Sequence, residues 1–180
     1  MKKLYLTTTL PYVNADPHIG HAVELVQADA YARSFRSKLG REQVFFNTGT
    51  DEHGLKMVQG ARAKQMAMHE FVEQYAQRFK DFCQLFHVAY DFFYQTSHPY
   101  HSKPAQAFWL RCLEHGAIYK GRYEGYYCVG CECYKTEKDL VDGKCPDHNT
   151  EPIVISPISR RIFIINLAHD WRRFGRRGAF

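Results

Sequence analysis

The chain has 180 residues, 45% of them hydrophobic and 15% aromatic, so it can bury a core and does not belong to the disordered class. Its net charge of +5 permits a nucleic-acid partner without arguing strongly for one. No segment has the apolar length that spans a membrane, and the short apolar run near the N-terminus lacks the cleavage site of a signal peptide. We therefore expect a soluble, cytoplasmic protein with no membrane partner.

Strand and helix patterns alternate along the first two-thirds of the chain. Apolar and β-branched runs predict short strands within residues 2–10, 43–47 and 90–97. Apolar residues at helical spacing predict three helices, with the positions Ile19, Val23, Val26, Ala30 and Phe35, then Val72, Tyr75, Ala76, Phe79, Phe82, Cys83 and Phe86, then Ala105, Phe108, Trp109 and Cys112. This alternation predicts an α/β fold with a parallel sheet covered on both faces. Ligands bind such folds beyond the carboxyl ends of the strands.

The segment TLPYVNADPHIGH, residues 9–21, follows the first predicted strand and places His18 and His21 where a helix begins. The first turn of a helix presents free N–H groups and a positive dipole end, which suits phosphate. Gly20 would let a ligand approach the backbone, and two imidazoles can donate hydrogen bonds as charge builds up on phosphate oxygens. On spacing alone, an ordinary helix start with surface histidines is the favoured interpretation.

From about residue 118 the sequence changes to short strands, turns and cysteines, which predicts a small insertion held by a metal. Two close pairs of ligands, Cys128 with Cys131 and Cys145 with His148, have the spacing of a tetrahedral zinc site. All four coordination positions are filled, so the zinc should be structural. One alternative is a set of scattered thiols with a surface histidine. Another is Cys133 as a ligand in place of Cys131, although a Cys-x2-Cys turn fits zinc better.

Three motifs in order, LPYVNADPHIGH, GTDEHG and YCVGCECYKTEKDLVDGKCPDH, resemble the N-terminal part of the methionyl-tRNA synthetases, which are class I aminoacyl-tRNA synthetases. The resemblance runs from Leu4 to about Pro152. It implies the first half of a Rossmann-like nucleotide-binding domain with a small zinc-knuckle (connective peptide) insertion. It also implies that ATP, with Mg²⁺, and methionine form methionyl-adenylate, and that the methionyl group then passes to tRNA(Met).

The resemblance also implies roles for residues around the ATP. His18 and His21 would contact the ATP phosphates and stabilise the transition state, and Asn14 and Gly20 would lie against the nucleotide. The substrate carboxylate is already a nucleophile, so this step needs positioning and charge stabilisation without a general acid or base. Cys83 and Cys112, the two cysteines outside the insertion, lie in apolar helical patterns and are therefore interpreted as core thiols.

For the amino acid, the resemblance implies a pocket lined by Leu10 and Tyr12, with Asp51 holding the α-amino group. A flexible thioether suits an aliphatic and aromatic wall, and a carboxylate suits an ammonium group. The alternatives are core packing for Leu10 and Tyr12 and a helix N-cap for Asp51. Glu52 and His53 receive no role.

We divide the chain into residues 1–117, the N-terminal half of the catalytic domain, residues 118–152, the zinc-knuckle insertion, and residues 153–180, a divergent basic tail. The KMSKS loop and the anticodon-binding domain of the family are absent from this chain, and the tail carries three arginine doublets. We expect a frameshift near Ile153, with a natural short paralogue as the alternative. A half-sheet would leave an edge and a face exposed, and the fragment would be catalytically impaired. The competing function is a non-catalytic, zinc-stapled RNA-binding module.

Overall fold

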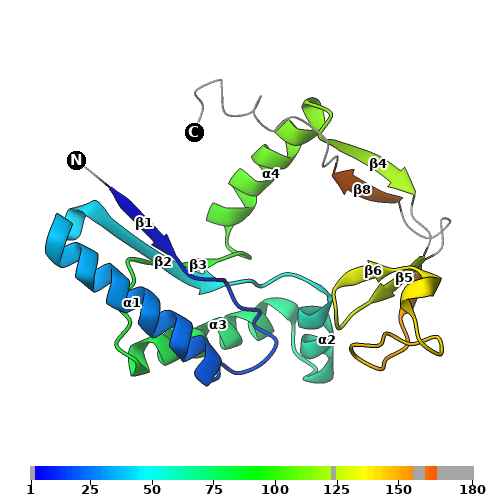
Figure 1. Cartoon of the computed structure of the whole chain (residues 1–180), viewed down its shortest axis with the longest axis horizontal. Helices are drawn as coiled ribbons and strands as arrows, with labels where there is room; N and C mark the ends of the chain where they lie inside the picture. Colours follow the sequence, from blue (N-terminus) through cyan, green and yellow to red (C-terminus); the bar gives the residue numbers. More distant parts are fainter. Residues whose placement is uncertain (1–2, 123–124, 156–160, 166–180) are drawn as a thin grey trace. The chain divides into compact units, whose positions relative to one another are not determined.

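The computed structural model describes residues 3–122, 125–155 and 161–165 (Figure 1). These residues belong to two compact units, Met1–Ser102 and Lys103–Phe180, which we describe separately. The expected division at residues 117 and 152 stays a prediction. Most of the tail, residues 156–160 and 166–180, lies outside the described residues, and so does the greater part of the region expected to follow a frameshift.

The first unit is built on a three-stranded parallel sheet with the strand order β1-β2-β3 (Figure 1). Leu4 pairs with Val44 and Asn47 pairs with Phe92. All three expected strands are present, and β2 continues further into the TGT segment than expected. The α/β class with a Rossmann-like parallel start is confirmed. The strands are β1 (Leu4–Thr7), β2 (Val44–Thr50) and β3 (Phe92–Gln95).

Helices connect these strands and cover one face of the sheet. α1 and α3 share a core with the sheet residues Val44 and Phe46, to which α1 contributes Leu25 and α3 contributes Cys83. The expectation of helices on both faces is therefore not met within this unit, because the two long helices lie on the same side. The helical elements of the first unit are α1 (Ile19–Leu39), the 3-10 turn η1 (Arg41–Gln43), α2 (Leu55–Ala63) and α3 (Met68–Leu85). α4 (Pro99–Glu114) begins in the first unit and continues into the second.

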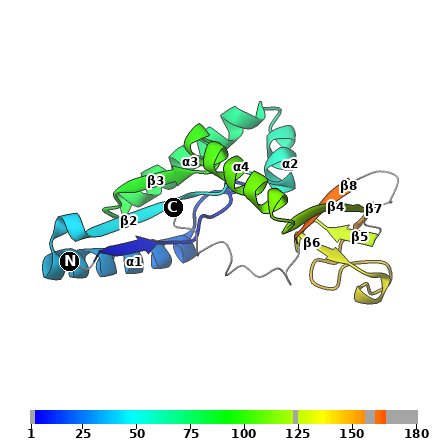
Figure 2. The ribbon, with the colours of Figure 1, turned by 90° about the horizontal axis from the view of Figure 1, so that it is seen from above.

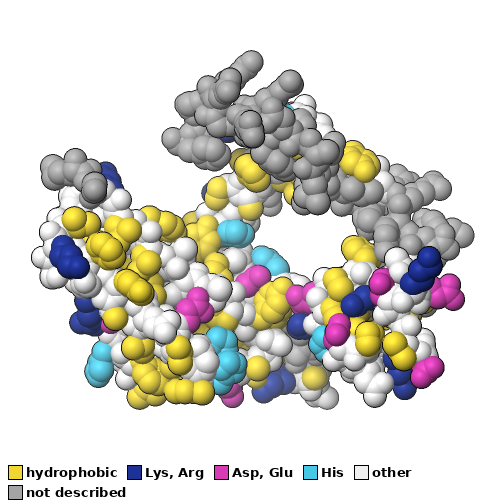
Figure 3. All heavy atoms as spheres, viewed as in Figure 1, with side chains coloured by type: hydrophobic (Ala, Val, Ile, Leu, Met, Phe, Trp, Pro, Cys, Tyr) yellow, Lys and Arg dark blue, Asp and Glu magenta, His cyan; other side chains and the backbone are white. Residues whose placement is uncertain are grey.

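The buried face of α1 differs from the one that its largest apolar residues suggested. Ala22, Leu25, Ala28 and Ala32 are buried, and these mostly small side chains let the helix lie close to the sheet. By contrast, Ile19, Val23 and Val26 are 73%, 53% and 44% exposed. Figure 3 shows hydrophobic side chains gathered on the surface of this unit. The helix was therefore predicted correctly, and its core face is made of residues other than the apolar ones whose spacing predicted it.

The opposite face of the sheet also carries exposed aromatic residues. Tyr5 and Phe45, paired in register on β1 and β2, stack with their ring centroids 5.9 Å apart, and both are exposed. β1 is an edge strand of this sheet among the described residues. In α4 the expected apolar face is only partly buried, because Cys112 is buried whereas Phe108 and Trp109 are exposed. Exposed apolar surface of this kind is typical of protein contact sites.

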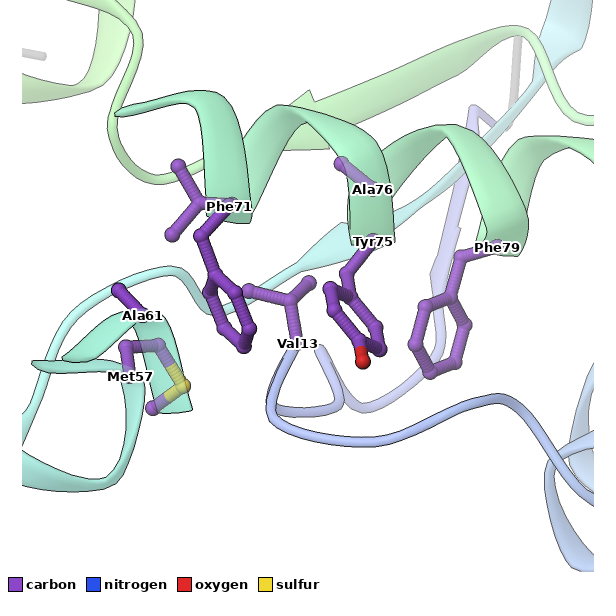
Figure 4. Close-up of a cluster of buried hydrophobic side chains, with 8 residues drawn as sticks. Val13, Met57, Ala61, Phe71, Tyr75, Ala76 and Phe79 are labelled. Atoms are coloured by element: carbon purple, nitrogen blue, oxygen red, sulfur yellow. The ribbon is translucent and has the colours of Figure 1, made fainter. Parts of the chain in front are cut away.

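A second core cluster lies where the β1–α1 loop meets α2 and α3 (Figure 4). The side chain of Val13 points from the loop toward Phe71 and Tyr75, and Met57 approaches the same cluster from α2 (Figure 4). The expected apolar stripe of α3 is confirmed, with Phe79 among its buried members. Because this cluster fixes Val13, it also fixes the loop residues on either side of it.

The second unit contains short strands after α4, as expected from residue 118 onward. β4 pairs with β8 in an antiparallel ribbon, and β5 lies between β6 and β7 in a small antiparallel sheet (Figure 2). Of the described helices, none is long and apolar enough to cross a membrane. The elements are β4 (Ile118–Arg122), β5 (Gly125–Cys128), β6 (Cys133–Lys135), the 3-10 turn η2 (Glu137–Asp139), β7 (Ile153–Ile155) and β8 (Arg161–Ile165).

Candidate functional site

Backbone hydrogen bonds join the loop after β1 to the segment after β2. Tyr12 and Asp51 form a parallel bridge, in which the Asp51 N–H donates to the carbonyl oxygen of Pro11 at 2.9 Å. The Val13 N–H donates back to the carbonyl oxygen of Asp51 at 3.4 Å. The carboxyl ends of neighbouring parallel strands lie at one edge of the sheet, so this bridge extends the sheet into the expected ligand position. It brings Tyr12 and Asp51 together.

The two predicted wall residues are not ordinary core residues. Tyr12 is 36% exposed, Leu10 is half-buried, and Val13 between Asp51 and α3 is fully buried. The Nζ atom of Lys56 lies 5.6 Å from the centre of the Tyr12 ring. Core packing, the alternative for this pair, therefore describes Val13 rather than Leu10 or Tyr12.

The carboxylate of Asp51 accepts hydrogen bonds on one oxygen. The His53 N–H donates to Oδ1 at 3.3 Å, and the Thr96 hydroxyl reaches the same oxygen at 3.4 Å. No described residue donates to Oδ2. Asp51 is not the N-cap of the following helix, because α2 begins at Leu55 and its N-cap is Gly54. One carboxylate oxygen is thus held from within the chain while the other is available to a ligand.

His18 and His21 form a reciprocal capping box at the start of α1. The Gly20 N–H donates to Nδ1 of His18, and the His18 N–H donates to Nδ1 of His21, both at 3.1 Å. The rings stack with centroids 3.9 Å apart. Because each Nδ1 accepts a hydrogen bond, each neutral ring carries its proton on Nε2. The pair therefore caps the helix through Nδ1, and each neutral ring keeps an Nε2–H donor that the capping box does not use.

The surroundings favour the neutral form of His21. Burial lowers the pKa of His21, the neighbouring His18 lowers it further, and Glu24 opposes them. Glu24 also accepts hydrogen bonds from the Thr9 N–H at 2.7 Å and the Thr9 hydroxyl at 2.6 Å, which join the loop to α1. A Cβ at position 20 would lie 2.9 Å from the His18 ring. A side chain at position 20 would therefore force the His18 ring to shift, so glycine favours the observed capping geometry. The sequence did not indicate this role.

The loop between β1 and α1 is held to α3 by a charged pair. Asp16 forms an ion pair with Arg78, whose guanidinium lies 4.5 Å from the centre of the Tyr75 ring. Asn14 lies in this loop and is exposed. A small pocket between the loop and the sheet is lined by residues that include Thr9, Pro11, His21, Glu24, Thr48 and Phe79. The loop is thus held to α1 through Glu24 and to α3 through Arg78.

The four expected metal ligands come together in the second unit. The ligand atoms of Cys128, Cys131, Cys145 and His148 all lie within 4.8 Å of one another. Cys131 Sγ is 3.5 Å from Cys145 Sγ and 3.3 Å from His148 Nδ1. Zinc–sulfur bonds of about 2.3 Å place tetrahedral ligand atoms about 3.8 Å apart, so the donor set fits zinc. The cluster includes Cys131 and leaves out the exposed Cys133.

The surroundings of the cluster favour the thiolate of Cys128, whereas desolvation and the neighbouring thiols raise the pKa of Cys131. The Cys131 N–H hydrogen-bonds to Cys128 Sγ at 3.4 Å, which lowers the pKa of the Cys128 thiol to about 6. Asp147 Oδ2 lies 3.5 Å from Lys135 Nζ and 3.5 Å from Cys131 Sγ. A Cβ at position 130 would lie 2.4 Å from the His148 ring, so only glycine fits there. Sequence reasoning did not single out these neighbours.

The two cysteines outside the insertion are buried, as expected. Cys83 and Cys112 are buried free thiols, and burial raises the pKa of Cys83 to about 11. A raised pKa keeps a thiol protonated and unreactive near neutral pH. These two residues therefore belong to the core.

Known proteins match this chain over most of its length. A family profile described as "tRNA synthetases class I (M)" matches residues 4–153. Methionine–tRNA ligases from Caldanaerobacter subterraneus subsp. tengcongensis and Thermotoga maritima are 44% and 39% identical over 81% of this chain, which spans 23% of each relative. A related ligase from Arabidopsis thaliana is named as chloroplastic/mitochondrial.

A solved structure agrees with the sequence matches. Mycobacterium tuberculosis methionyl-tRNA synthetase in complex with methionyl-adenylate superposes with a TM-score of 0.81 at 32% identity, covering 91% of this chain and 32% of that chain. The chain thus spans about a quarter of the length of the curated relatives it matches. It belongs to the methionyl-tRNA synthetase family of class I ligases and corresponds to part of the N-terminal catalytic portion.

Proposed function

We propose that this chain carries the methionine and ATP contacts of a methionine–tRNA ligase, which activates methionine with ATP and transfers it to tRNA(Met). The observation that carries this proposal is the Tyr12–Asp51 bridge, which places an aromatic ring and a carboxylate together at the carboxyl ends of β1 and β2. The histidine capping box lies on the same loop. An amino acid and a nucleotide phosphate would thus bind to the two ends of one segment.

The proposed chemistry follows from the donors and acceptors of these residues. Oδ2 of Asp51 accepts a hydrogen bond from the substrate ammonium group, while Leu10 and Tyr12 contact the thioether. The Nε2–H groups of His18 and His21 donate to ATP phosphate oxygens and stabilise charge in the transition state. The N–H groups at the start of α1 also attract the phosphate charge. Mg²⁺ binds together with ATP as part of the substrate. Asn14 and Gly20 lie against the nucleotide in this proposal.

The Cys/His cluster is proposed as a structural zinc site held by Cys128, Cys131, Cys145 and His148. A bound zinc ion would stabilise the small sheet, because four protein ligands leave no position for a reacting molecule. The zinc ion thus contributes to folding, and the chemistry stays with the loop residues.

The chain is proposed to have little activity by itself, because it spans about a quarter of the length of the curated relatives that it matches. We expect the protein to act in the cytoplasm, although one relative is named as organellar. The competing proposal, a non-catalytic RNA-binding module, predicts RNA affinity with a steep salt dependence and no affinity for methionine.

Calorimetry with the whole chain tests the proposed function. Methionine should bind, and Asp51→Asn should weaken that binding by about tenfold or more, because a charge-assisted hydrogen bond contributes about 1.5–3 kcal/mol. ATP–pyrophosphate exchange should be slow or absent with the fragment. Methionine binding that is unchanged by Asp51→Asn would refute the assignment of Asp51. Rapid methionine-dependent exchange would refute the proposed impairment.

A further inference from the structure

The turn after β3 contacts the carboxylate proposed to bind the substrate amine. Thr96, the residue after β3, is only 7% exposed. Its hydroxyl oxygen accepts a hydrogen bond from the Glu52 N–H at 2.8 Å and lies 3.4 Å from Oδ1 of Asp51. The Thr96 carbonyl oxygen accepts from Nε2 of His53 at 3.0 Å, and its N–H donates to Thr50 at 3.3 Å. Thr96 is thus fixed at its backbone as well as at its side chain.

The hydrogen bonds of Thr96 determine where its own proton points. A hydroxyl carries one hydrogen, and the oxygen already accepts the Glu52 N–H, so the hydrogen is free to donate elsewhere. Oδ1 of Asp51 is the acceptor within reach. The 3.4 Å separation lies at the long end of the hydrogen-bond range. With His53 also donating to Oδ1, both internal donors hold one oxygen and leave Oδ2 for a ligand.

Glu52 holds this turn in place from the buried side. It is 1% exposed, and its carboxylate accepts the Thr50 hydroxyl at 2.7 Å and the Ser97 N–H at 3.2 Å. The Ser97 hydroxyl donates to the same carboxylate. Burying a carboxylate is costly unless it is hydrogen-bonded, and both oxygens of Glu52 accept hydrogen bonds here. Glu52 therefore joins the end of β2 to the turn after β3 and sets the position of Thr96 relative to Asp51.

We propose that Thr96 is a positioning residue for the Asp51 carboxylate. Its hydroxyl orients the carboxylate so that Oδ2 faces the α-ammonium group of an amino-acid substrate, and so it sets the preference for ligands that carry this group. The proposal rests on the proposed function of Asp51. It adds a specificity role for a residue that is 45 positions away in sequence and touches Asp51 only after the sheet has formed.

Two substitutions at position 96 separate orientation from packing. Thr96→Val keeps the volume and removes the hydroxyl, and Thr96→Ser keeps the hydroxyl. Calorimetry with the whole chain compares methionine with 4-(methylthio)butanoate, which is methionine without its amino group. We expect Thr96→Val to reduce the preference for methionine about tenfold, with unchanged binding of the deaminated ligand, and Thr96→Ser to restore it. An equal loss for both ligands would mean that Thr96 only supports the fold, and would overturn the proposal.

Asp51→Asn distinguishes a failure of the proposed function of Asp51 from a failure of the proposed role of Thr96. If that variant retains the full preference for methionine, the proposed function of Asp51 fails. If it loses the preference while Thr96→Val retains it, only the role of Thr96 fails. A measurement without ligand uses NMR three-bond couplings that report the χ1 rotamer of Asp51. One rotamer is expected in the wild type and Thr96→Ser, and averaging is expected in Thr96→Val. An unaveraged rotamer in Thr96→Val would overturn the proposal even if neither ligand bound.

Discussion

Replacing Gly130 with alanine should break the Cys/His cluster without changing any of its ligands. A Cβ at position 130 would lie 2.4 Å from Cδ2 of His148, whereas ordinary contacts begin near 3.4 Å, so the ring must move by about 1 Å. Metal–ligand distances tolerate only about 0.2 Å of change. The displaced ring would leave the fourth coordination position. Substitutions next to metal ligands reduce metal affinity about 10–100-fold. Because Gly130→Ala would displace a ligand itself, we expect its zinc affinity to fall about 100-fold or more, which corresponds to about 2.7 kcal/mol.

Competition against a chromophoric zinc chelator at neutral pH measures this loss directly. Cys133→Ala is the matched control, because Cys133 is exposed and lies outside the cluster, and its zinc affinity should stay within about threefold of the wild type. Tight zinc binding by Gly130→Ala, with His148 still a ligand, would refute the argument from the Cβ contact. A loss in Cys133→Ala equal to that in Cys131→Ala would instead make Cys133 a ligand.

Two further predictions concern the fold. Met57→Ala removes a fully buried side chain and should lower the free energy of unfolding by about 2–5 kcal/mol in urea titrations, whereas Leu85→Ala, at an exposed position, should change it little. Burial alone would raise the pKa of Asp91, but hydrogen bonds from Arg41, the Phe46 N–H and Arg36 lower it overall. The ionised Asp91 side chain therefore stabilises the fold fully above about pH 4, and this contribution is lost as the pH falls through the lowered pKa. The free energy of unfolding should thus differ widely between the wild type and Asp91→Asn at pH 7, and the difference should shrink in acid. A gap that is the same at pH 7 and pH 3 would contradict this account.

Local patterns predicted the long elements and failed where contacts are distant. The stripe of α3 gave the correct face because large apolar residues recur on one side only. In α1 large apolar side chains such as Ile19 and Val23 are exposed, and the buried face consists mostly of alanines. Alanine is a weaker hydrophobic signal than isoleucine or valine, so the spacing of large apolar residues did not reveal this face. The short α2 was not predicted, and its Gly60 lies where a Cβ would meet the Phe71 ring at 2.7 Å. That glycine serves a contact with another helix.

In the candidate site, too, the sequence predicted groups of nearby residues but not contacts between distant segments. The Cys/His spacing is local to one small sheet, so the sequence predicted all four members of the cluster. The histidine pair was also found, but its capping geometry was not, since histidine is an unusual cap. The contacts of Asp51 with Thr96 depend on the register between β2 and β3, which pairs residues 47–50 with 92–95. No pattern along the chain reports such a register.

The histidine capping box has a consequence for the order in which the site forms. Its hydrogen bonds join residues only two or three positions apart, and contacts of that range form on the timescale of helix growth, well below a millisecond. The Tyr12–Asp51 bridge must instead close a loop of about forty residues and wait for β1 and β2 to pair. During folding, the end of the loop that carries the histidine pair should therefore take shape early, and the end at Tyr12 should take shape with the sheet.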